Sequence, residues 1–538
     1  MAAMIVAPEA LPVEAGAEVL KRGGNAVDAA VTAVFAQGVV DPHDSSIGGY
    51  VLLNLHRAGD APGTSTVMDA PVTAGSKTTP DMWVDRYLGP NPDGWGFFLR
   101  DKVNELGYTS ICTPATPRAL ETILQRWGTI SLAEAVEPAA RIAEEGFPVD
   151  NRVAAYWLQP APYPQMTSLL DFVKANPEAS KIYLKGDGGP YLAGEVIRNP
   201  DYAATLRHLG RYGADDFHEG ELAARMVRDL EANGAYVTAG DLASYKVRDM
   251  PATMGTYRGL TIASSPAPHG GPTLVEILNI LEGWDMASLG HNSAEYILRF
   301  ALAMKAAFAD RHDRLGDPLF VDVPLEWMTS KERAAEWRGR IDRGEEIEVR
   351  LDPLPSPSTT HVSVVDDAGT VVALTHSLGG SSGVISPGMG FMYNNSMVNY
   401  HPLPSHPNSI APGKSRTTGM APTIVYRDGK PILNIGAPGG TRIITGIAQV
   451  LVNIVDFGMT PQEAIHAPRF DCQANRITCQ IRIPESVCAE VRRRHPIERV
   501  ALGHGGFAFV HAIGIDPESG RLTGGADAGS AGMALAVP

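Results

Sequence analysis

The chain has few cysteines for its length, and they lie far apart. Cys112, Cys472, Cys479 and Cys488 are the four cysteines among 538 residues, and no two of them form a C-x-x-C pair. A disulfide scaffold or a zinc site of the finger type needs denser or more regular spacing. We therefore expect four structural thiols, no disulfide framework and no metal site.

Long apolar runs and clusters of basic residues are also missing. No run of about 18 uncharged apolar residues occurs, so no membrane-spanning helix is expected. The first residues, MAAMIVAPEALPVEAG, contain no basic segment followed by an apolar core, and this pattern predicts a cytoplasmic location.

The charge balance narrows the range of partners. The net charge is −15, and the densest basic run is Arg492-Arg493-Arg494. Binding to nucleic acid or to an anionic membrane needs clustered Lys and Arg to contact phosphates. The sequence therefore predicts neither partner. No nucleotide fingerprint or metal cluster suggests a cofactor either.

What is present is the composition of a large α/β protein, with helices concentrated in the first two thirds. Hydrophobic residues make up 44% and charged residues 20% of the chain, as in ordinary globular proteins. Residues 48–56 read as a buried strand, and residues 256–265 read as one strand that enters a Pro/Gly turn. Apolar residues at helical spacing predict helices in 11–24, 26–40, 117–128, 131–146, 219–234 and 293–316.

The last third changes character after a linker. Residues 343–358, RGEEIEVRLDPLPSPS, combine charge with prolines and read as an exposed connection. Alternating apolar and polar residues around turn sequences then predict hairpins in 361–377, 423–437 and 507–527, with helices in 441–458 and 461–467 between them. We expect both halves, which meet at residue 359, to share one α/β body.

A threonine stands at the junction of the two halves. Thr359 follows the linker directly and opens the first strand of the strand-rich half. Threonine favours strands, so this position has a plain structural explanation. If the chain were cut between Ser358 and Thr359, however, the free α-amine would have a pKa of about 7.7–8.0. That amine can activate the threonine hydroxyl as a nucleophile.

A glycine pair is the second candidate feature. Gly439 and Gly440 lie between a predicted strand and a predicted helix that begins near Thr441. Two backbone N–H groups at a helix N-terminus suit a developing oxyanion. A tight turn explains the same pair equally simply. A phosphate-binding loop does not, since no lysine of the Walker type follows.

Several stretches in the same order resemble the γ-glutamyltransferase (γ-glutamyl transpeptidase) family. They span most of the chain, and TTHVSVVD is the most specific of them. The stretches are KRGGNAVDAAVTAVFAQGVVDPHDSSIGGY, YRGLTIASSPAPHGG, ILNILEGWDM, FADRHDRLGDPLF, TTHVSVVDDAGTVVALT, NNSMVNY, APTIVYRDGKPILNIGAPGGTRI and APRF.

The resemblance implies a fold and a maturation step. Members of this family have the four-layer αββα sandwich of the N-terminal-nucleophile hydrolases. They are made as one precursor that cleaves itself before the threonine and becomes a heterodimer of two fragments. Here these would be residues 1–358, a large helix-rich subunit, and residues 359–538, a small strand-rich subunit. Whether two such heterodimers associate is left open.

The resemblance also implies roles for individual residues. Thr359 corresponds to the nucleophile, which first attacks the Ser358 carbonyl, and Gly439 and Gly440 correspond to the oxyanion hole. Ser377 stands where the family has a second threonine that contacts the nucleophile. Thr360 and His361 also match, but a role in shaping the strand explains them well. The positions matched to the substrate pocket are Gly379, Ser396, Asn399, Thr418, Gly419 and Arg442.

The pocket positions depart from the family pattern. The arginine that clamps the substrate carboxylate is absent, because Asp69 is followed by Ala70-Pro71. In the family, an asparagine and a Gln or Glu help to hold the substrate ammonium group. In this chain Gly379 replaces the asparagine, and Ser396 replaces the Gln or Glu. The usual aspartate is Asn399, and losing this anion matters because a buried ammonium without a counter-charge is costly.

Other departures affect the neighbouring pocket positions. Thr418-Gly419 replace a serine pair of the family. Arg442 matches a basic residue of the family, and a structural role for it is expected as much as a role in the substrate pocket. The loop 401–416 is shorter than the lid of transpeptidases and resembles the branch that includes oxamate amidohydrolase. Trp83 and the aromatics of 89–99 can line a remade pocket, or serve surface packing or a subunit contact.

The sequence therefore predicts an autoprocessing amidohydrolase. It would cleave a small amide substrate through an acyl-Thr359 intermediate, without a cofactor, and an open site would favour hydrolysis over transfer. One alternative is a γ-glutamyl hydrolase or transpeptidase that uses glutathione-like donors through other contacts. A cephalosporin acylase is a third possibility within the class. From a different class, an uncleaved inactive relative with a binding role also fits.

Overall fold

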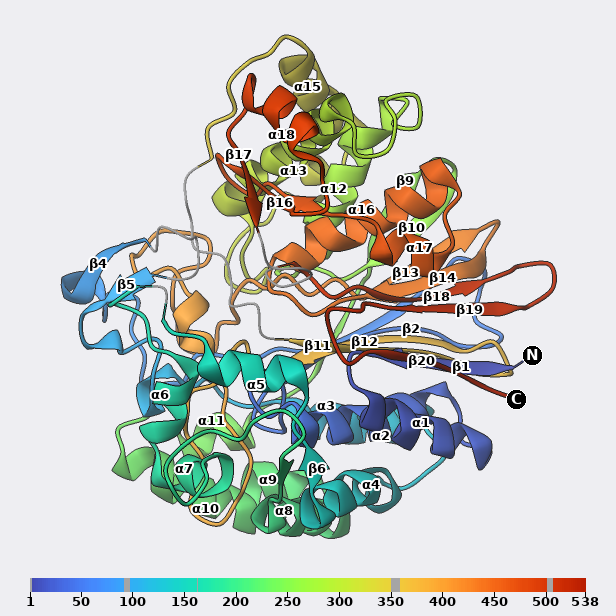
Figure 1. Ribbon diagram of the computed structural model, residues 1–538. Helices are drawn as coiled ribbons and strands as arrows, with labels where there is room; N and C mark the ends of the chain where they lie inside the picture. Colours follow the sequence, from blue (N-terminus) through green and yellow to red (C-terminus); the bar gives the residue numbers. More distant parts are fainter. Residues whose placement is uncertain (1, 91–96, 162, 350–358, 501–506) are drawn as a thin grey trace.

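Two antiparallel sheets form the centre of the molecule in a computed structural model (Figure 1). The model describes residues 2–90, 97–161, 163–349, 359–500 and 507–538. The first sheet has seven strands in the order β20 (Met533–Val537), β1 (Ala3–Ala7), β11 (Thr360–Val365), β12 (Val371–Ser377), β2 (Tyr50–His56), β3 (Thr66–Ala70) and β8 (Arg248–Met250).

The second sheet lies against one face of the first. It has six strands in the order β19 (Leu522–Ala526), β18 (His511–Ile515), β14 (Lys430–Gly436), β13 (Thr423–Arg427), β10 (Leu260–Ser264) and β9 (Thr253–Tyr257). Smaller sheets are formed by β15 (Phe470–Asp471) with β16 (Ile477–Gln480) and β17 (Ile497–Val500), by β4 (Tyr87–Pro90) with β5 (Phe97–Leu99), and by β6 (Phe147–Pro148) with β7 (Val196–Ile197).

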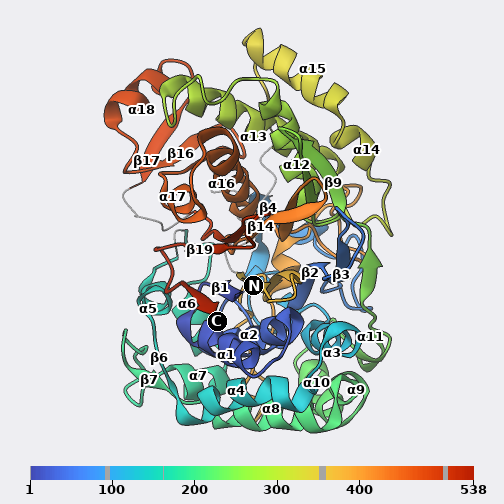
Figure 2. The same ribbon diagram turned by 90° about the vertical axis from the view of Figure 1, so that its right-hand side faces the viewer.

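Helices cover the outer face of each sheet (Figures 1 and 2). Below the first sheet in Figure 1 lie α1 (Ala10–Lys21), α2 (Ala26–Val40), α3 (Thr116–Trp127), α4 (Leu132–Glu145), α5 (Asn151–Leu158), α6 (Leu169–Lys174), α7 (Pro177–Tyr183), α8 (Pro200–Tyr212), α9 (Ala214–Glu219), α10 (Glu221–Ala232) and α11 (Ala239–Ala243). Beyond the second sheet lie α12 (Gly271–Glu282), α13 (Ala294–Arg314), α14 (Leu325–Met328), α15 (Lys331–Asp342), α16 (Arg442–Phe457), α17 (Pro461–His466) and α18 (Glu485–Arg492).

Three buried apolar clusters fill the spaces between these layers. One joins the first sheet to its helices, and a second joins the other sheet to α12, α13 and α16. The smallest cluster lies between the sheets and combines Met4 and Val371 of the first with Ala263 and Ile424 of the second. This is a four-layer αββα sandwich, as predicted.

The parts before and after residue 359 are interleaved within both sheets. In the first sheet β1 lies between β20 and β11, and β12 pairs with β2. In the second sheet β10 pairs with β13. Both parts therefore contribute strands to one body, as expected. The two chain ends meet in the same way, since Ala3 pairs with Val537.

Most of the predicted elements form where the pattern placed them. Asn25 caps α2, accepting hydrogen bonds from the backbone N–H groups of Val27 and Asp28. Residues 256–265 are the exception, because they contain the end of β9 and all of β10 instead of one strand. Arg258 and Gly259 have φ of 50° and 79°, which makes this dipeptide a hairpin turn. The five residues of β1 were not predicted.

The described residues contain no helix long and apolar enough to cross a membrane. Their four cysteines are buried and form no disulfide. No group of three or more His, Cys, Asp or Glu side chains in the described ranges is placed to hold a metal ion.

Two buried asparagines connect the sheets. Asn54 of β2 donates to the carbonyls of Ala263 and Pro422, at 2.9 and 3.2 Å. Asn434 of β14 donates in the opposite direction, to the carbonyls of Val364 and Val372, at 3.3 and 2.8 Å. Each amide therefore supplies polar contacts between two layers that are otherwise held by apolar packing.

Replacing Asn434 with alanine should lower stability. The change leaves buried carbonyls without their donor and opens a small cavity, which together cost about 1–3 kcal/mol. We expect a lower urea midpoint for Asn434→Ala, whereas Asn233→Ala, at an exposed helix end, should leave the midpoint unchanged. Equal midpoints for the two variants would contradict the role of Asn434.

Histidines are also buried in the sheets. Burial lowers the pKa of His376 in β12 to about 3 and that of His511 in β18 to about 4. Burial likewise lowers the pKa of His361 in β11. Nε2 of His376 lies 2.9 Å from Oε1 of Gln37 and donates to it, because an amide oxygen only accepts. These side chains are neutral in the folded protein at neutral pH.

Acid should therefore destabilise the fold. An unfolded histidine takes up a proton near pH 6.5, whereas the folded chain resists protonation of His376 down to about pH 3. The stabilising contribution of His376 is present above pH 6.5 and falls by at most about 1.4 kcal/mol per pH unit below it. In urea titrations between pH 7.5 and pH 5, His376→Gln should lose less stability than the wild type. His466→Gln, at an exposed position, should match the wild type.

Candidate active site

Thr359 immediately precedes β11, with its side chain against Ser377 of β12. Its Oγ1 lies 3.1 Å from Oγ of Ser377. The register of the two strands pairs Thr360 with His376 and so puts Thr359 opposite Ser377. The Ser377 Oγ also accepts the backbone N–H of Gly379 at 2.7 Å, so the serine hydroxyl can donate to Thr359. The predicted nucleophile and its neighbouring hydroxyl are in contact. Ser358 lies outside the described residues.

Thr359 is almost entirely enclosed by the rest of the chain, with 3% of its surface exposed. Side chains alternate between the two faces of a strand. Thr359 and His361 therefore face the second sheet, where a Cβ at Gly436 of β14 would lie 2.2 Å from the His361 ring. Within the first sheet, His361 Nδ1 lies 2.8 Å from Oγ1 of Thr375 in β12. Thr360 faces the helices instead. This confirms that Thr360 and His361 have structural partners of their own.

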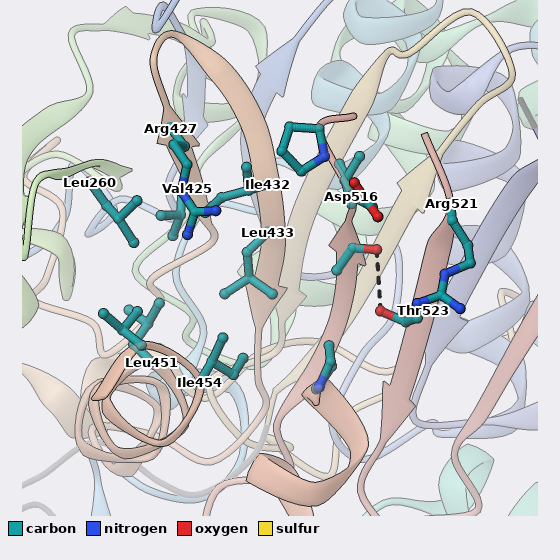
Figure 3. Close-up of a pocket in the computed structure, with 15 residues that line it drawn as sticks. Leu260, Val425, Arg427, Ile432, Leu433, Leu451, Ile454, Asp516, Arg521 and Thr523 are labelled. Carbon is teal, nitrogen blue, oxygen red and sulfur yellow. Dashed lines mark hydrogen bonds between the residues drawn. The ribbon is translucent and has the colours of Figure 1, made fainter. Parts of the chain in front are cut away.

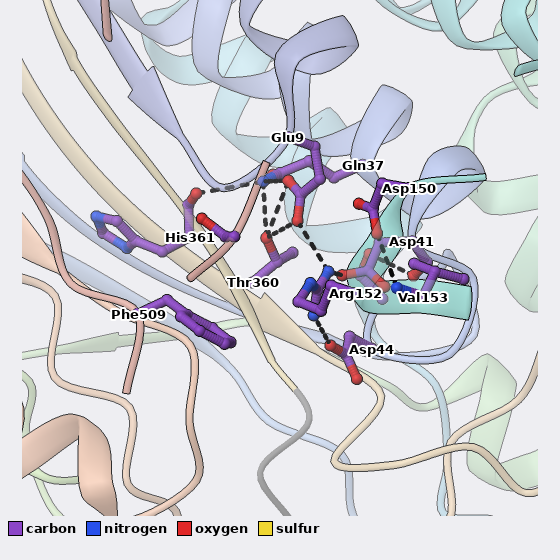
Figure 4. A network of polar contacts seen from close by, with 12 residues as sticks. Glu9, Gln37, Asp41, Asp44, Asp150, Arg152, Val153, Thr360, His361 and Phe509 are labelled. Atoms are coloured by element: carbon purple, nitrogen blue, oxygen red, sulfur yellow. Dashed lines mark hydrogen bonds and ion pairs between the residues drawn. The ribbon is translucent and has the colours of Figure 1, made fainter. Parts of the chain in front are cut away.

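A buried polar network holds the first residues of β11 from the helical side (Figure 4). Nε2 of Gln37 in α2 donates to Thr360 Oγ1 at 2.8 Å and to the His361 carbonyl at 3.2 Å. The same amide donates to Glu9 at 2.8 Å. Gln37 therefore fixes the backbone of the strand immediately after Thr359.

The network ends in a cluster of charges around Arg152. This arginine of α5 contacts Glu9, Asp41 and Asp44. Burial raises the pKa of Glu9 to about 7, against the opposing charge of Arg152. Burial alone would lower the pKa of Arg152, but the surrounding carboxylates raise it above its ordinary value. The charges stabilise one another and lock α5 against the loop after α2.

The glycine pair forms a tight turn before α16. Gly439 and Gly440 have φ of 135° and 60°, which favour glycine. A Cβ at Gly439 would lie 2.7 Å from Cα of Ala508. The turn precedes Thr441, the N-cap of α16, so the N–H groups of the pair lie at a helix N-terminus. This geometry fits the predicted oxyanion site.

Thr418 and Gly419 pack behind this turn. A Cβ at Gly419 would lie 2.0 Å from the Gly440 carbonyl oxygen, so the two segments are in direct contact. The Thr418 Oγ1 lies 2.7 Å from Nδ1 of His269, whose Nε2 lies 3.0 Å from Asp69. The hydroxyl of Thr418 is therefore held in place by a buried histidine.

Gly379 and Ser396 come together around a guanidinium that the sequence reasoning did not single out. A Cβ at Gly379 would lie 2.4 Å from Nη2 of Arg416. The same Nη2 lies 3.2 Å from Ser396 Oγ. Asn399 ends the 3₁₀ turn Ser396–Asn399, and its side-chain amide is buried without a hydrogen-bond partner. These predicted pocket positions thus cluster near Ser377.

Arg442 has a different environment. It is the first residue of α16, and its Nε lies 3.5 Å from Oδ2 of Asp471. Thr445 Oγ1 donates to the other oxygen of that carboxylate at 2.7 Å. The contacts favour the structural role for Arg442 over direct substrate contact.

The aromatic segment is described only in part. Residues 91–96 lie outside the described ranges, and Trp83 is buried in the core of the first sheet and its helices. Phe97 packs edge-on against His401, with ring centroids 4.8 Å apart. One aromatic of this segment therefore contacts the loop 401–416, whereas Trp83 serves the core.

An apolar pocket lies elsewhere, on the outer side of the second sheet (Figure 3). It has a volume of about 230 Å³, and Leu433, Leu451 and Ile454 contribute to its wall between β14 and α16. Arg521 and Asp516 stand at its edge. None of the predicted site residues lines this pocket, so it is separate from the site around Thr359.

Sequence reasoning missed Glu9, Gln37, Arg152 and Arg416. Gln37 and Glu9 carry no local signal, because each lies in or beside an apolar helix. Arg416 is the last residue of the loop that is shorter than the lid of transpeptidases. A basic residue just before Thr418-Gly419 was the signal that could have identified it.

Comparisons with known proteins agree with this geometry. A family model described as gamma-glutamyltranspeptidase matches residues 13–537. The glutathione hydrolase proenzyme of Pseudomonas sp. strain A14 is 34% identical over 489 residues, which cover 87% of this chain and 81% of that protein. The acylase ACY 1 proenzyme of Pseudomonas sp. strain SE83 is 34% identical over 531 residues, which cover 97% of this chain and 91% of that protein.

A solved structure supports the same assignment. The crystal structure of cephalosporin acylase from Bacillus halodurans matches the fold with a TM-score of 0.85 and 27% identity, covering 99% of this chain and 95% of that one. The match extends over both sheets and both helical layers. Because the family model and both relatives span nearly the whole sequence, the chain belongs to the gamma-glutamyltranspeptidase family.

Proposed function

We propose that this chain is a self-cleaving amidohydrolase that uses Thr359 as its nucleophile. The observation that carries the proposal is the contact between the hydroxyls of Thr359 and Ser377 at the start of β11. Cleavage between Ser358 and Thr359 would give fragments 1–358 and 359–538, held together as a heterodimer. Two relatives of this chain are proenzymes, one of a glutathione hydrolase and one of an acylase, and they support this maturation.

The proposed reaction divides amide cleavage into two steps. The Thr359 α-amine accepts the hydroxyl proton while Oγ1 attacks the amide carbon. The N–H groups of Gly439 and Gly440 stabilise the tetrahedral oxyanion. The C–N bond then breaks, the leaving amine takes the proton, and an acyl ester remains on Thr359. Water attacks the ester, which releases the acid and restores the hydroxyl.

The role of Ser377 is to position the nucleophile. Its oxygen is anchored by the Gly379 N–H, so its hydroxyl points toward Thr359 Oγ1. A donor at this place orients the attacking oxygen and stabilises its charge as the proton leaves.

A γ-glutamyl substrate fits the described pocket less well. The positions that would hold its ammonium group are Gly379, Ser396 and Asn399, none of which is anionic. The buried guanidinium of Arg416 next to them would repel an ammonium group. A cytoplasmic location stays a proposal that follows from the sequence alone.

Thr359→Ala should abolish both self-cleavage and hydrolysis, because the same hydroxyl performs both steps. Intact mass should show one species near 57.3 kDa, whereas the wild type should give two fragments, the smaller beginning at Thr359. Thr370→Ala, in the turn of the same hairpin, should still cleave. A cleaved Thr359→Ala variant would overturn the assignment.

Ser377→Ala should lower kcat on a chromogenic anilide by roughly 10-fold to 100-fold, which is the cost of losing one hydrogen bond to a charged group. Ser377→Thr should restore most of the rate, since it returns the hydroxyl. The measurement is steady-state kinetics on protein already shown to be cleaved. An unchanged kcat in Ser377→Ala would mean that the contact has no catalytic role.

A further inference from the structure

Arg416 is a buried cation beside the proposed nucleophile. It is the last residue of the loop 401–416, and 1% of its surface is exposed. Its Nη2 donates to the Tyr50 hydroxyl at 2.5 Å and to Ser396 Oγ at 3.2 Å, and its Nη1 donates to the Thr417 carbonyl at 3.0 Å. The Tyr50 ring also lies under the guanidinium, with 4.9 Å between Cζ and the ring centroid. All of these contacts are to neutral groups.

The charge of Arg416 has no counterpart in the described part of the chain. No Asp or Glu there forms an ion pair with it, and its Nε is buried without a hydrogen-bond partner. Other buried arginines are paired, Arg152 with three carboxylates and Arg469 with Asp527. Arg311 has no ion pair, but it donates to two backbone carbonyls. An unpaired buried charge is costly unless a ligand completes it.

The guanidinium is close to the reacting hydroxyls. Its Nη2 occupies the space that a Cβ at Gly379 would need, since the two would lie 2.4 Å apart. The N–H of Gly379 donates to Ser377, which contacts Thr359. The absence of a side chain at position 379 therefore makes room for the guanidinium next to the catalytic hydroxyls.

Arg416 also lies near the position from which the expected arginine is missing. Thr73 and Ser415 form an antiparallel bridge, which places Arg416 across from Val72. Pro71, the next residue back, is where the family resemblance would put a carboxylate-binding arginine. The same region of the fold thus receives a guanidinium from a different segment of the chain.

Asn399 provides a second unsatisfied group nearby. Its Nδ2 and Oδ1 are both buried without partners. The side chain of Asn408 connects it to the arginine segment, because Nδ2 donates to the Asn399 carbonyl at 2.7 Å and Oδ1 accepts the Thr417 N–H at 2.9 Å. The Nε of Arg416 and the side-chain amide of Asn399, both buried without a hydrogen-bond partner, therefore lie on segments linked through Asn408.

From these contacts we infer that Arg416, assisted by Asn399, binds a carboxylate at the far end of the substrate's acyl group. The substrate class is then a monoamide of a short dicarboxylic acid, without an ammonium group. Guanidinium N–H groups match the two oxygens of a carboxylate. The inference rests on the proposed function, because it assigns the acyl group that Thr359 would accept.

The test compares acyl groups that differ only in charge. The substrates are succinyl, glutaryl and adipyl p-nitroanilides and their neutral carbamoyl isosteres, which carry a terminal amide in place of the carboxylate. For the best chain length, cleaved wild type should favour the carboxylate by roughly 100-fold in kcat/KM, the effect of a buried charge-assisted contact. Arg416→Met should remove this preference, and Arg416→Lys should keep part of it. Arg476→Met, which removes one exposed charge, should behave as wild type.

The possible results distinguish the role of Arg416 from the proposed function. Wild type that cleaves itself and hydrolyses the neutral isosteres as fast as the carboxylates keeps the proposed function and overturns the role of Arg416. Equal losses on both substrates in Arg416→Met would make Arg416 structural and also overturn it. If Arg416→Met fails to cleave itself, the deciding result is the preference of the wild type for the carboxylate substrates over their neutral isosteres. A wild type that neither cleaves itself nor hydrolyses any anilide overturns both claims.

Discussion

The pairing of β11 with β12 is the constraint on which the site depends. Its register sets Thr359 against Ser377 and, on the opposite face, Thr360 against His376. A slip of one residue would exchange the two faces and direct the nucleophile toward the helices. Interactions on both faces of β11 oppose such a slip. On the helical side Gln37 donates hydrogen bonds to Thr360 and to the His361 carbonyl, and on the other side His361 packs against Gly436 of the second sheet.

Buried charge is handled in two ways within the same body. Around Arg152 the protein supplies the carboxylates itself, so the guanidinium has ion-pair partners that fix helix α5 and the loop after α2. Around Arg416 the protein supplies hydroxyl and carbonyl oxygens only, within the described chain. The first arrangement is a structural clamp, whereas the second is complete only with an anion from outside. Proximity to Thr359 connects that second arrangement to substrate choice.

Local periodicity and turn residues such as Asp366-Asp367 predicted the helices named from the sequence and the three hairpins, whereas the four-layer αββα arrangement came from the family resemblance. Helices such as α8 and α12 were not predicted. The sequence also identified Thr359, Ser377 and the glycine pair, although Thr359 and Ser377 stood out through family resemblance and not through periodicity. Arg416 and Gln37 could not be found in this way. Whether an arginine is paired or unpaired depends on contacts between residues distant in sequence, such as Tyr50 and Ser396. The short β1 likewise gains its structure from β11 and β20 on either side.

The interleaving of strands has a consequence for the lifetime of the protein. The uncut chain can fold as one molecule, with every strand tethered to its neighbours. After cleavage before Thr359, β1 would stay paired with β20 and β11 of the other fragment. If the two fragments unfold and separate, each must meet the other again by diffusion. Self-cleavage would thus make unfolding harder to reverse. The uncut chain refolds as one molecule, whereas the two separated fragments of the mature enzyme must also associate again.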